Sequence, residues 1–150
     1  MYPHEMIKLK RLELGMSEAD TAQAASLSIF EYGDVEQHRT EFISAIPLYK
    51  AKLLCQVLGL DMRKVLELEP SLDLHERPLP FELVGLPRHK MVEKRRLVLR
   101  KSVATVADAI GYDDAAVVSA EFDGSFLENY PVDVLAALAR ELDLPLLPLI

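Results

Sequence analysis

One stretch of the sequence carries enough clustered cations to bind phosphate groups. Between residues 88 and 101 stand, against the one acid Glu93, the basic side chains Arg88, His89, Lys90, Lys94, Arg95, Arg96, Arg100 and Lys101. Such a cluster neutralises nucleic-acid phosphates and releases counterions. It fits an acidic protein surface equally well, or a solvated helix face that binds nothing. The formal net charge of the whole chain is −7, the opposite of the bias typical of a protein that lives on DNA.

Other chemistry is poorly supported by residue type and spacing. The four histidines lack the spacing of metal ligands, and Cys55 is the only cysteine, which excludes an internal disulfide. The six glycines are scattered, so no phosphate-binding loop is expected. Asp113 and Asp114 resemble a helix cap more than a catalytic pair. We therefore expect no metal, no cofactor and no enzymatic activity.

The basic cluster lies inside a segment that the sequence contains twice. Residues 4–36 match residues 89–121 with a shift of 85, and the match continues from Pro47 and Pro131 with a shift of 84. The matched pairs include His4 with His89, Arg11 with Arg96, Ser17 with Ser102, Ala22 with Ala107 and Glu36 with Glu121. A repeat of this length predicts one folding unit used twice. We expect domains over residues 1–69 and 89–150, joined by a linker over 70–88 that contains four prolines.

Helix signals dominate both copies. Predicted helices in the first copy cover about 5–14, 17–25, 28–36, 47–58 and 61–68, with Ser17 and Ser28 as N-caps and Gly59 as a stop. Predicted helices in the second copy cover about 90–100, 102–110, 113–121 and 131–142. The apolar end, 144–150, is expected to pack on the core or on a partner. Apolar runs are too short to span a bilayer, so we expect a cytoplasmic protein without membrane contact.

Three features resemble the phage-repressor-like (Cro/XRE-type) helix-turn-helix family. They are the pairing of Arg11 with Glu36 and of Arg96 with Glu121, the turns at 22–28 and 107–113, and the pattern Leu54-Cys55-x-x-Leu58-Gly59-Leu60. The resemblance implies an all-α fold of two repeated lambda-repressor-like five-helix domains, with both Arg–Glu pairs acting as structural ion pairs. It also implies that Cys55 lies in the core. In this family the third helix enters the DNA major groove.

The positions that read bases in that family lack suitable side chains here. By resemblance they fall on Ile29, Phe30 and Asp34 in the first copy, and on Asp114, Ala115 and Ser119 in the second. None of these is a bidentate reader of guanine or adenine. The phosphate-contact position, usually Gln in the family, is Glu18 in the first copy and Val103 in the second. These substitutions favour weakened DNA binding.

An apolar surface with an acidic rim favours protein contact instead. The residues expected to bind a partner are Ile29, Phe30, Glu31, Asp34, Ala115, Ala116 and Val118. A competing interpretation turns Phe30 inward against the linker. The preferred hypothesis is a non-enzymatic regulator of transcription that binds another regulatory protein, as a monomeric pseudo-dimer or a homodimer. In the alternative, a DNA-binding regulator, phosphate contacts come from Lys90, Lys94, Arg95, Arg100 and Lys101, and a base contact from Ser119.

Overall fold

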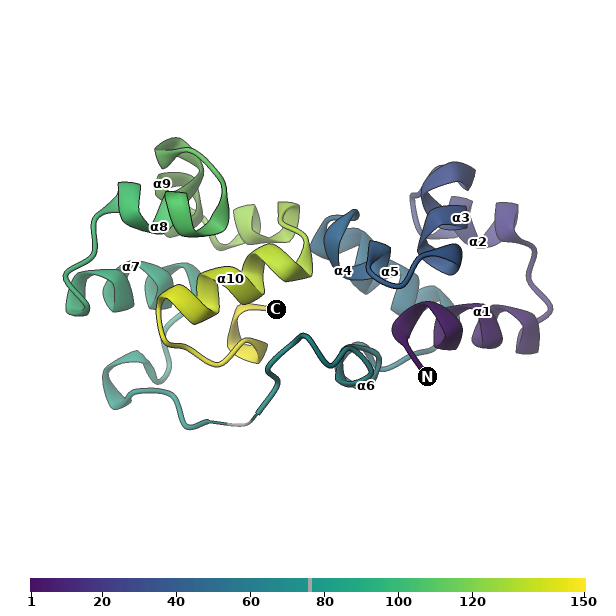
Figure 1. Ribbon diagram of the computed structural model, residues 1–150, viewed down its shortest axis with the longest axis horizontal. Helices are drawn as coiled ribbons and strands as arrows, with labels where there is room; N and C mark the ends of the chain where they lie inside the picture. The colour runs from purple at the N-terminus through teal and green to yellow at the C-terminus, as the bar shows by residue number, and fades with distance from the viewer. Residues whose placement is uncertain (76) are drawn as a thin grey trace. The chain divides into compact units, whose positions relative to one another are not determined.

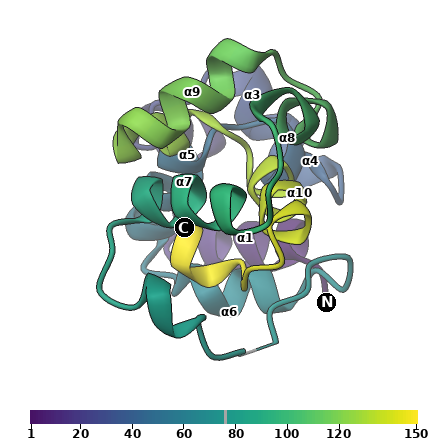
Figure 2. The same cartoon turned by 90° about the vertical axis from the view of Figure 1, so that its left-hand side faces the viewer.

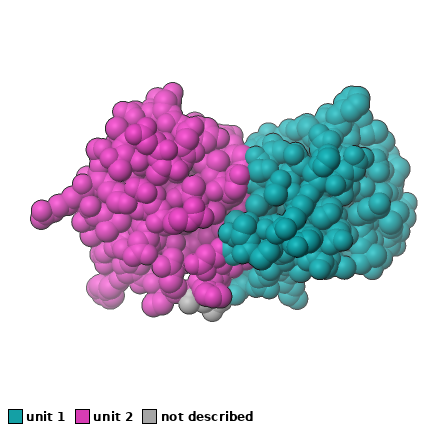
Figure 3. Space-filling view, viewed as in Figure 1, with its two compact units in different colours: residues 1–72 teal, residues 73–150 magenta. Residues whose placement is uncertain are grey.

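The described part of the chain, residues 1–75 and 77–150 of a computed structural model, is helical and contains no β-strand (Figure 1). It divides into two compact units, Met1–Leu72 and Asp73–Ile150, which Figure 3 shows in different colours. The proline-rich segment 70–88 is shared between them. Its first three residues close unit 1, and its described residues from Asp73 onward belong to unit 2.

Unit 1 contains six α-helices. They are α1 (Pro3–Glu13), α2 (Glu18–Ala24), α3 (Ile29–Gln37), α4 (Glu41–Ser44), α5 (Leu48–Leu58) and α6 (Met62–Glu67). Ser17 and Ser28 begin α2 and α3 as predicted, because each hydroxyl oxygen accepts a hydrogen bond from a backbone N–H of the first turn, at 3.0 Å in both cases. Gly59 ends α5 in the left-handed conformation, with φ of 65°.

Helix α4 lies between α3 and α5, where the sequence predicted no helix. Thr40 gives it no side-chain cap, so no local signal marks its start. Its second and third residues, Phe42 and Ile43, are buried, and Phe42 has no exposed surface. Burial of two large apolar side chains therefore stabilises a turn of helix that local propensity does not predict.

Unit 1 closes with a buried carboxylate. Glu69 is 2% exposed and accepts hydrogen bonds from the guanidinium of Arg39, at 3.1 and 3.4 Å, and from the backbone N–H of Ser71. Burial raises the pKa of Glu69, but these donors outweigh it, so the pKa lies below its usual value. Arg39 also lies over the ring of Tyr2, 3.9 Å from its centroid. The chain after α6 is thereby attached to α1 and to the segment before α4.

Unit 2 contains four α-helices and three short 3-10 helices among its described residues. They are η1 (Phe81–Leu83), α7 (Arg88–Val98), α8 (Val103–Ile110), α9 (Asp114–Phe122), η2 (Gly124–Asn129), α10 (Val132–Glu141) and η3 (Leu147–Leu149). Ser102 and Asp113 cap α8 and α9 as predicted, through bonds to the backbone N–H of Thr105 and Ala116. Figure 2 looks onto this unit and shows α9 lying over α7.

The apolar C-terminal segment packs on the core of unit 2, one of its two predicted placements. Leu144, Leu146 and Leu149 are at most 3% exposed. The segment before η1 is held to this end of the unit, because Arg77 donates to Asp143 Oδ1 at 3.1 Å and to the Leu144 carbonyl at 3.2 Å. Pro145 and Pro148 shorten the last helical element to η3.

Candidate functional site

The exposed end of α3 carries two apolar side chains that nothing in unit 1 covers. Phe30 is 82% exposed and Ile29 is 49% exposed. The interpretation that turns Phe30 inward is therefore wrong. A reciprocal capping box fixes the backbone beneath them, since Ser28 Oγ accepts from the Glu31 N–H and Glu31 Oε1 accepts from the Ser28 N–H. We call Ile29 and Phe30 the α3 knob.

Helices α2 and α3 also carry three partly exposed carboxylates. The side chain of Asp34 is 58% exposed, that of Glu18 is 48% exposed and lies 3.7 Å from Arg11 Nη2, and that of Glu31 is 41% exposed and lies 3.5 Å from Lys50 Nζ. The Ser28 N–H, more than the nearby Lys50 ammonium, holds the pKa of Glu31 below its usual value, so this group stays ionised. Negative charge at this surface opposes the approach of DNA phosphates.

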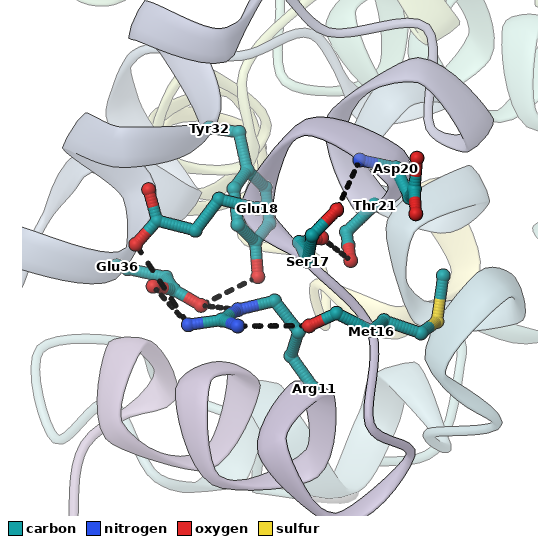
Figure 4. A network of polar contacts seen from close by, with 8 residues as sticks. All are labelled: Arg11, Met16, Ser17, Glu18, Asp20, Thr21, Tyr32 and Glu36. Carbon is teal, nitrogen blue, oxygen red and sulfur yellow. Dashed lines mark hydrogen bonds and ion pairs between the residues drawn. The ribbon is translucent and has the colours of Figure 1, made fainter.

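Beneath this surface a polar network ties α1 to α3 (Figure 4). Arg11 Nε donates to Glu36 Oε1 at 2.6 Å, Nη2 donates to Oε2 at 3.2 Å, and Nη1 donates to the Met16 carbonyl at 2.9 Å. Tyr32 Oη donates to Glu36 Oε1 at 2.7 Å. Burial raises the pKa of Glu36, but the bonds from Arg11 and Tyr32 outweigh it and lower the pKa overall. The same hydrogen bond to Glu36 raises the pKa of Arg11. This network is structural, because both charged side chains are almost fully buried.

Unit 2 contains the corresponding ion pair. Arg96 donates through Nε and Nη2 to the two oxygens of Glu121, and through Nη1 to the Lys101 carbonyl at 3.1 Å. Both Arg–Glu pairs expected from the sequence are present, and each arginine also binds the carbonyl five residues ahead of it. The pairs fix α3 on α1 and α9 on α7.

Helix α9 presents a different set of side chains from α3. Asp114 and Ala115 are exposed at its start, Val118 is 54% exposed and Phe122 is 84% exposed at its end. Ala116 was expected at the partner surface, and this expectation is wrong. Ala116 is buried, its backbone N–H donates to Asp113 Oδ1 at 3.0 Å, and its carbonyl accepts from the Tyr130 hydroxyl at 2.9 Å.

Two members of the basic cluster, Arg95 and Lys101, make contacts inside unit 2. They were expected to contact phosphate or an acidic partner, and this expectation is wrong. The Arg95 side chain is 13% exposed and donates to the Leu142 carbonyl, with Asp143 and Glu82 nearby. Lys101 Nζ lies 2.7 Å from the Glu141 carbonyl and 2.8 Å from its carboxylate. These contacts join α7 to the C-terminal end of α10.

The rest of the cluster is only partly free. Arg88 pairs with Glu128 at 2.9 Å and donates to the Leu149 carbonyl. Lys90 pairs with Glu93 at 3.4 Å at the surface. In the part of the chain that the structure describes, Lys94 and Arg100 remain as exposed cations without an ion pair. Two free cations are a small electrostatic basis for binding a nucleic acid.

An apolar hollow between α7 and α9 was missed at the sequence level. Its exposed apolar wall is formed by Leu97, 57% exposed, with Val118 and Phe122. Lys90 and Glu93 line its α7 side. A second hollow also contacts Val118 and Phe122, and its other lining residues are Ser119, Asp123 and Phe126. The available signal was the spacing of Val118 and Phe122, which places both on one helix face. We call the depression that Leu97, Val118 and Phe122 line the α7–α9 hollow.

Sites for metals or small molecules have weaker support. Within residues 1–75 and 77–150, no three His, Cys, Asp or Glu side chains lie close enough together to hold a metal ion. A hollow of about 490 Å³ is lined by residues 74, 75, 77, 78 and 145–148, but the guanidinium of Arg77 at its edge is already held by Asp143 and the Leu144 carbonyl. None of the helices formed by the described residues combines the length and apolar character needed to cross a bilayer.

Comparison with known proteins adds no relative. The chain matches no protein-family model, no curated protein and no solved structure.

Proposed function

We propose that this protein is a non-enzymatic regulator of transcription, built from two phage-repressor-like helix-turn-helix units, that acts by binding another regulatory protein. Support for the family comes from helices that begin at matched caps in the two units and from the two Arg–Glu pairs. One observation carries the protein-contact function. Where this family places base-reading side chains, α3 exposes a phenyl ring, 82% accessible, within a rim of carboxylates.

The α3 knob has the composition of an interface centre. Aromatic side chains that become desolvated on binding dominate the energy of protein interfaces, while charged neighbours form the rim. Phe30 offers no hydrogen bond to a base edge, and the exposed carboxylate of Asp34 repels phosphate. The knob therefore fits an apolar pocket with basic surroundings on a partner protein.

Capture of a partner tests this function. The tagged chain and its Phe30→Ser variant are used to recover bound protein from a lysate of the source cells. Phe30→Ser should recover at least about tenfold less of the specific partner, since an interface aromatic contributes about 2 kcal/mol or more. Phe81→Ser is the matched control, because Phe81 is 93% exposed on η1 of unit 2. Equal recovery by Phe30→Ser and the unmodified chain contradicts the proposal.

The second candidate is a DNA-binding regulator that uses atypical contacts. It is favoured by the exposed cations Lys94 and Arg100 and by Ser119 at the base-reading position of α9. Fluorescence anisotropy on random and genomic duplexes across a salt series separates the two candidates. Phosphate contacts predict a binding constant that falls steeply with salt, and a shallower slope for the variant Lys94→Ala with Arg100→Ala. Sequence-selective binding that survives physiological salt supports this second candidate.

A further inference from the structure

The segments that form the second and third helices of each unit lack basic side chains. Residues 12–38 contain six Asp and Glu and no Lys or Arg, and residues 102–139 contain seven Asp and Glu and no Lys or Arg. All 17 Lys and Arg of the chain therefore lie outside these two ranges, which contain α2 and α3 of unit 1 and α8 and α9 of unit 2. Among these acids only Glu36 and Glu121 occupy matching positions of the repeat. The two segments thus share the sign of their charge and not the residues that carry it.

The surface of the first of these segments is acidic. Two of its carboxylates lie near cations, but the side chains of those cations, Arg11 and Lys50, are only 9% and 19% exposed, whereas the carboxylates are 48% and 41% exposed. The Asp34 carboxylate is 58% exposed, and the group 3.9 Å from it is the imidazole of His38. Because the cations lie mostly below the surface, a partner that approaches α2 and α3 meets negative charge.

The α3 knob adds an exposed aromatic ring to this acidic surface. A partner that fits both features must present cations together with apolar groups. A DNA-binding surface has this composition, since its Lys and Arg contact phosphates and its apolar side chains contact the methyl group of thymine. In a protein that regulates transcription, a clustered basic surface is the mark of nucleic-acid binding. The chemistry of the α3 knob and its surroundings therefore points to one kind of occupant.

We propose that the α3 knob and the carboxylates of α2 and α3 occupy the DNA-binding surface of the regulatory partner. In this complex the carboxylates take the place of phosphates, and the Phe30 ring takes the place of an apolar contact to a base. The partner then binds either DNA or this protein and not both together, so the protein regulates by excluding its partner from DNA. The inference rests on the proposed function, because it names the kind of partner that the same knob binds.

Displacement from immobilised DNA tests this exclusion. Sheared genomic duplex DNA on cellulose is loaded with a lysate of the source cells, washed, and then challenged with the purified chain at constant salt. The unmodified chain should release a specific protein, which leaves the column in complex with the chain, while no chain stays on the DNA. Phe30→Ser should require at least about tenfold more protein for half-maximal release, because it removes the aromatic centre of the contact.

Matched variants locate the contact. Phe122→Ser removes a ring that is 84% exposed on α9 of the other unit, and should release the partner like the unmodified chain. Asp34→Asn should raise the concentration for half-maximal release about two- to fivefold, the usual contribution of one exposed charge pair. Glu67→Gln is its control and should change nothing, since Glu67 of α6 has similar exposure and also pairs with a residue four positions away. Circular dichroism verifies that each variant is folded.

Four results overturn the inference. They are an unmodified chain that releases no protein, a chain that is retained on the DNA together with its partner, a Phe30→Ser variant that releases the partner as well as the unmodified chain does, and a Phe122→Ser variant that fails to release it. The proposed function is judged separately by capture from the lysate. A partner that Phe30 captures but that stays on DNA leaves the proposed function intact and removes only the exclusion from DNA.

Discussion

Units 1 and 2 hold the same internal contact under different surfaces. Arg11 binds Glu36 and the Met16 carbonyl, as Arg96 binds Glu121 and the Lys101 carbonyl. Only unit 1 adds a phenol to the carboxylate, since Tyr32 of α3 corresponds to Val117 of α9. The arginine–glutamate contact that orients one helix on another is therefore the same in both units, but the glutamate of unit 1 accepts one more hydrogen bond.

Backbone conformation extends the correspondence. Three matched pairs of positions have left-handed φ in both units, and in each pair one unit has glycine and the other does not, whereas Gly85 of unit 2 has no counterpart. The pairs are Gly15 with Arg100, Ser26 with Gly111, and Gly59 with Asp143. Matching φ values at non-glycine residues show that helix packing imposes the turn, since an L-residue adopts this conformation at a cost of about 1 kcal/mol.

The exposed positions show no such correspondence. Ile29 and Phe30 correspond to Asp114 and Ala115, so the knob exists only in unit 1. Gln37 corresponds to Phe122, so the aromatic wall of the hollow exists only in unit 2. The comparison teaches that buried contacts define the scaffold, whereas exposed side chains give each unit its own binding surface.

The largest predicted effect breaks the shared contact. Glu36→Ala leaves the buried Arg11 guanidinium and the Tyr32 hydroxyl without their acceptor, and should lower the free energy of unfolding of unit 1 by about 4 kcal/mol. The matched Glu121→Ala should cost unit 2 about 3 kcal/mol, since no phenol loses a partner. Hydrogen exchange measured by mass spectrometry on peptides from each unit assigns the loss. Equal losses would show that the Tyr32 bond contributes nothing.

Lowering the pH should weaken the Arg11–Glu36 contact of unit 1, because it protonates the Glu36 carboxylate. Because the pKa of Glu36 is lowered in the folded state, its contribution is complete above the pKa of the unfolded chain and is lost as pH falls through the folded pKa. Urea unfolding at a series of pH values below neutrality should therefore show stability falling toward acid. Glu36→Gln should flatten that dependence for unit 1, and an unchanged dependence would assign the acid sensitivity to other carboxylates, such as Glu69.

Removing the phenol makes the two contacts more alike. Tyr32→Phe deletes the 2.7 Å bond to Glu36 and keeps the ring, which has no exposed surface. The loss should be about 1.5 kcal/mol, at the low end of what a hydrogen bond to a charged group contributes. Urea unfolding followed by circular dichroism measures it. Tyr49→Phe, at a ring 44% exposed, should change stability by less than about 0.5 kcal/mol.

The smallest predicted effect exchanges a left-handed residue between units. Ser26→Gly places glycine at φ of 57°, as unit 2 has at Gly111, and should raise stability by about 0.5–1 kcal/mol. Gly111→Ser should lower it by a similar amount. Thermal unfolding of both variants measures these small shifts of opposite sign. A destabilising Ser26→Gly would mean that the serine side chain has a favourable contact.

Local signals allowed much of the scaffold to be predicted from sequence. Ser17, Ser28, Ser102 and Asp113 act as the caps that their positions indicated, and Gly59 ends α5. Each is a short-range feature, in which a side chain bonds to a backbone group three residues away or glycine supplies positive φ. Helix α4 escaped prediction because burial of Phe42 and Ile43 stabilises it.

The surfaces were predicted less well, because exposure depends on contacts between residues far apart in sequence. Arg95 and Lys101 read as free cations, yet their acceptors lie 47 and 40 residues further along the chain. The exposure of Phe122 depends on how α9 packs on α7, and no local pattern reports that packing. The exposure of the α3 knob was expected from the helix-turn-helix resemblance and not from its local position, since Ala116 in the first turn of α9 is buried.

The thiol of Cys55 can report on the opening of unit 1. It is 2% exposed in α5, and burial, with a smaller effect from Asp61, raises the pKa of its thiol to about 12. The folded protein therefore holds it as an unreactive thiol at neutral pH. Since it is the only cysteine in the chain, the alkylation rate of the native protein measures how often unit 1 opens. Opening of unit 2 alone does not change this rate.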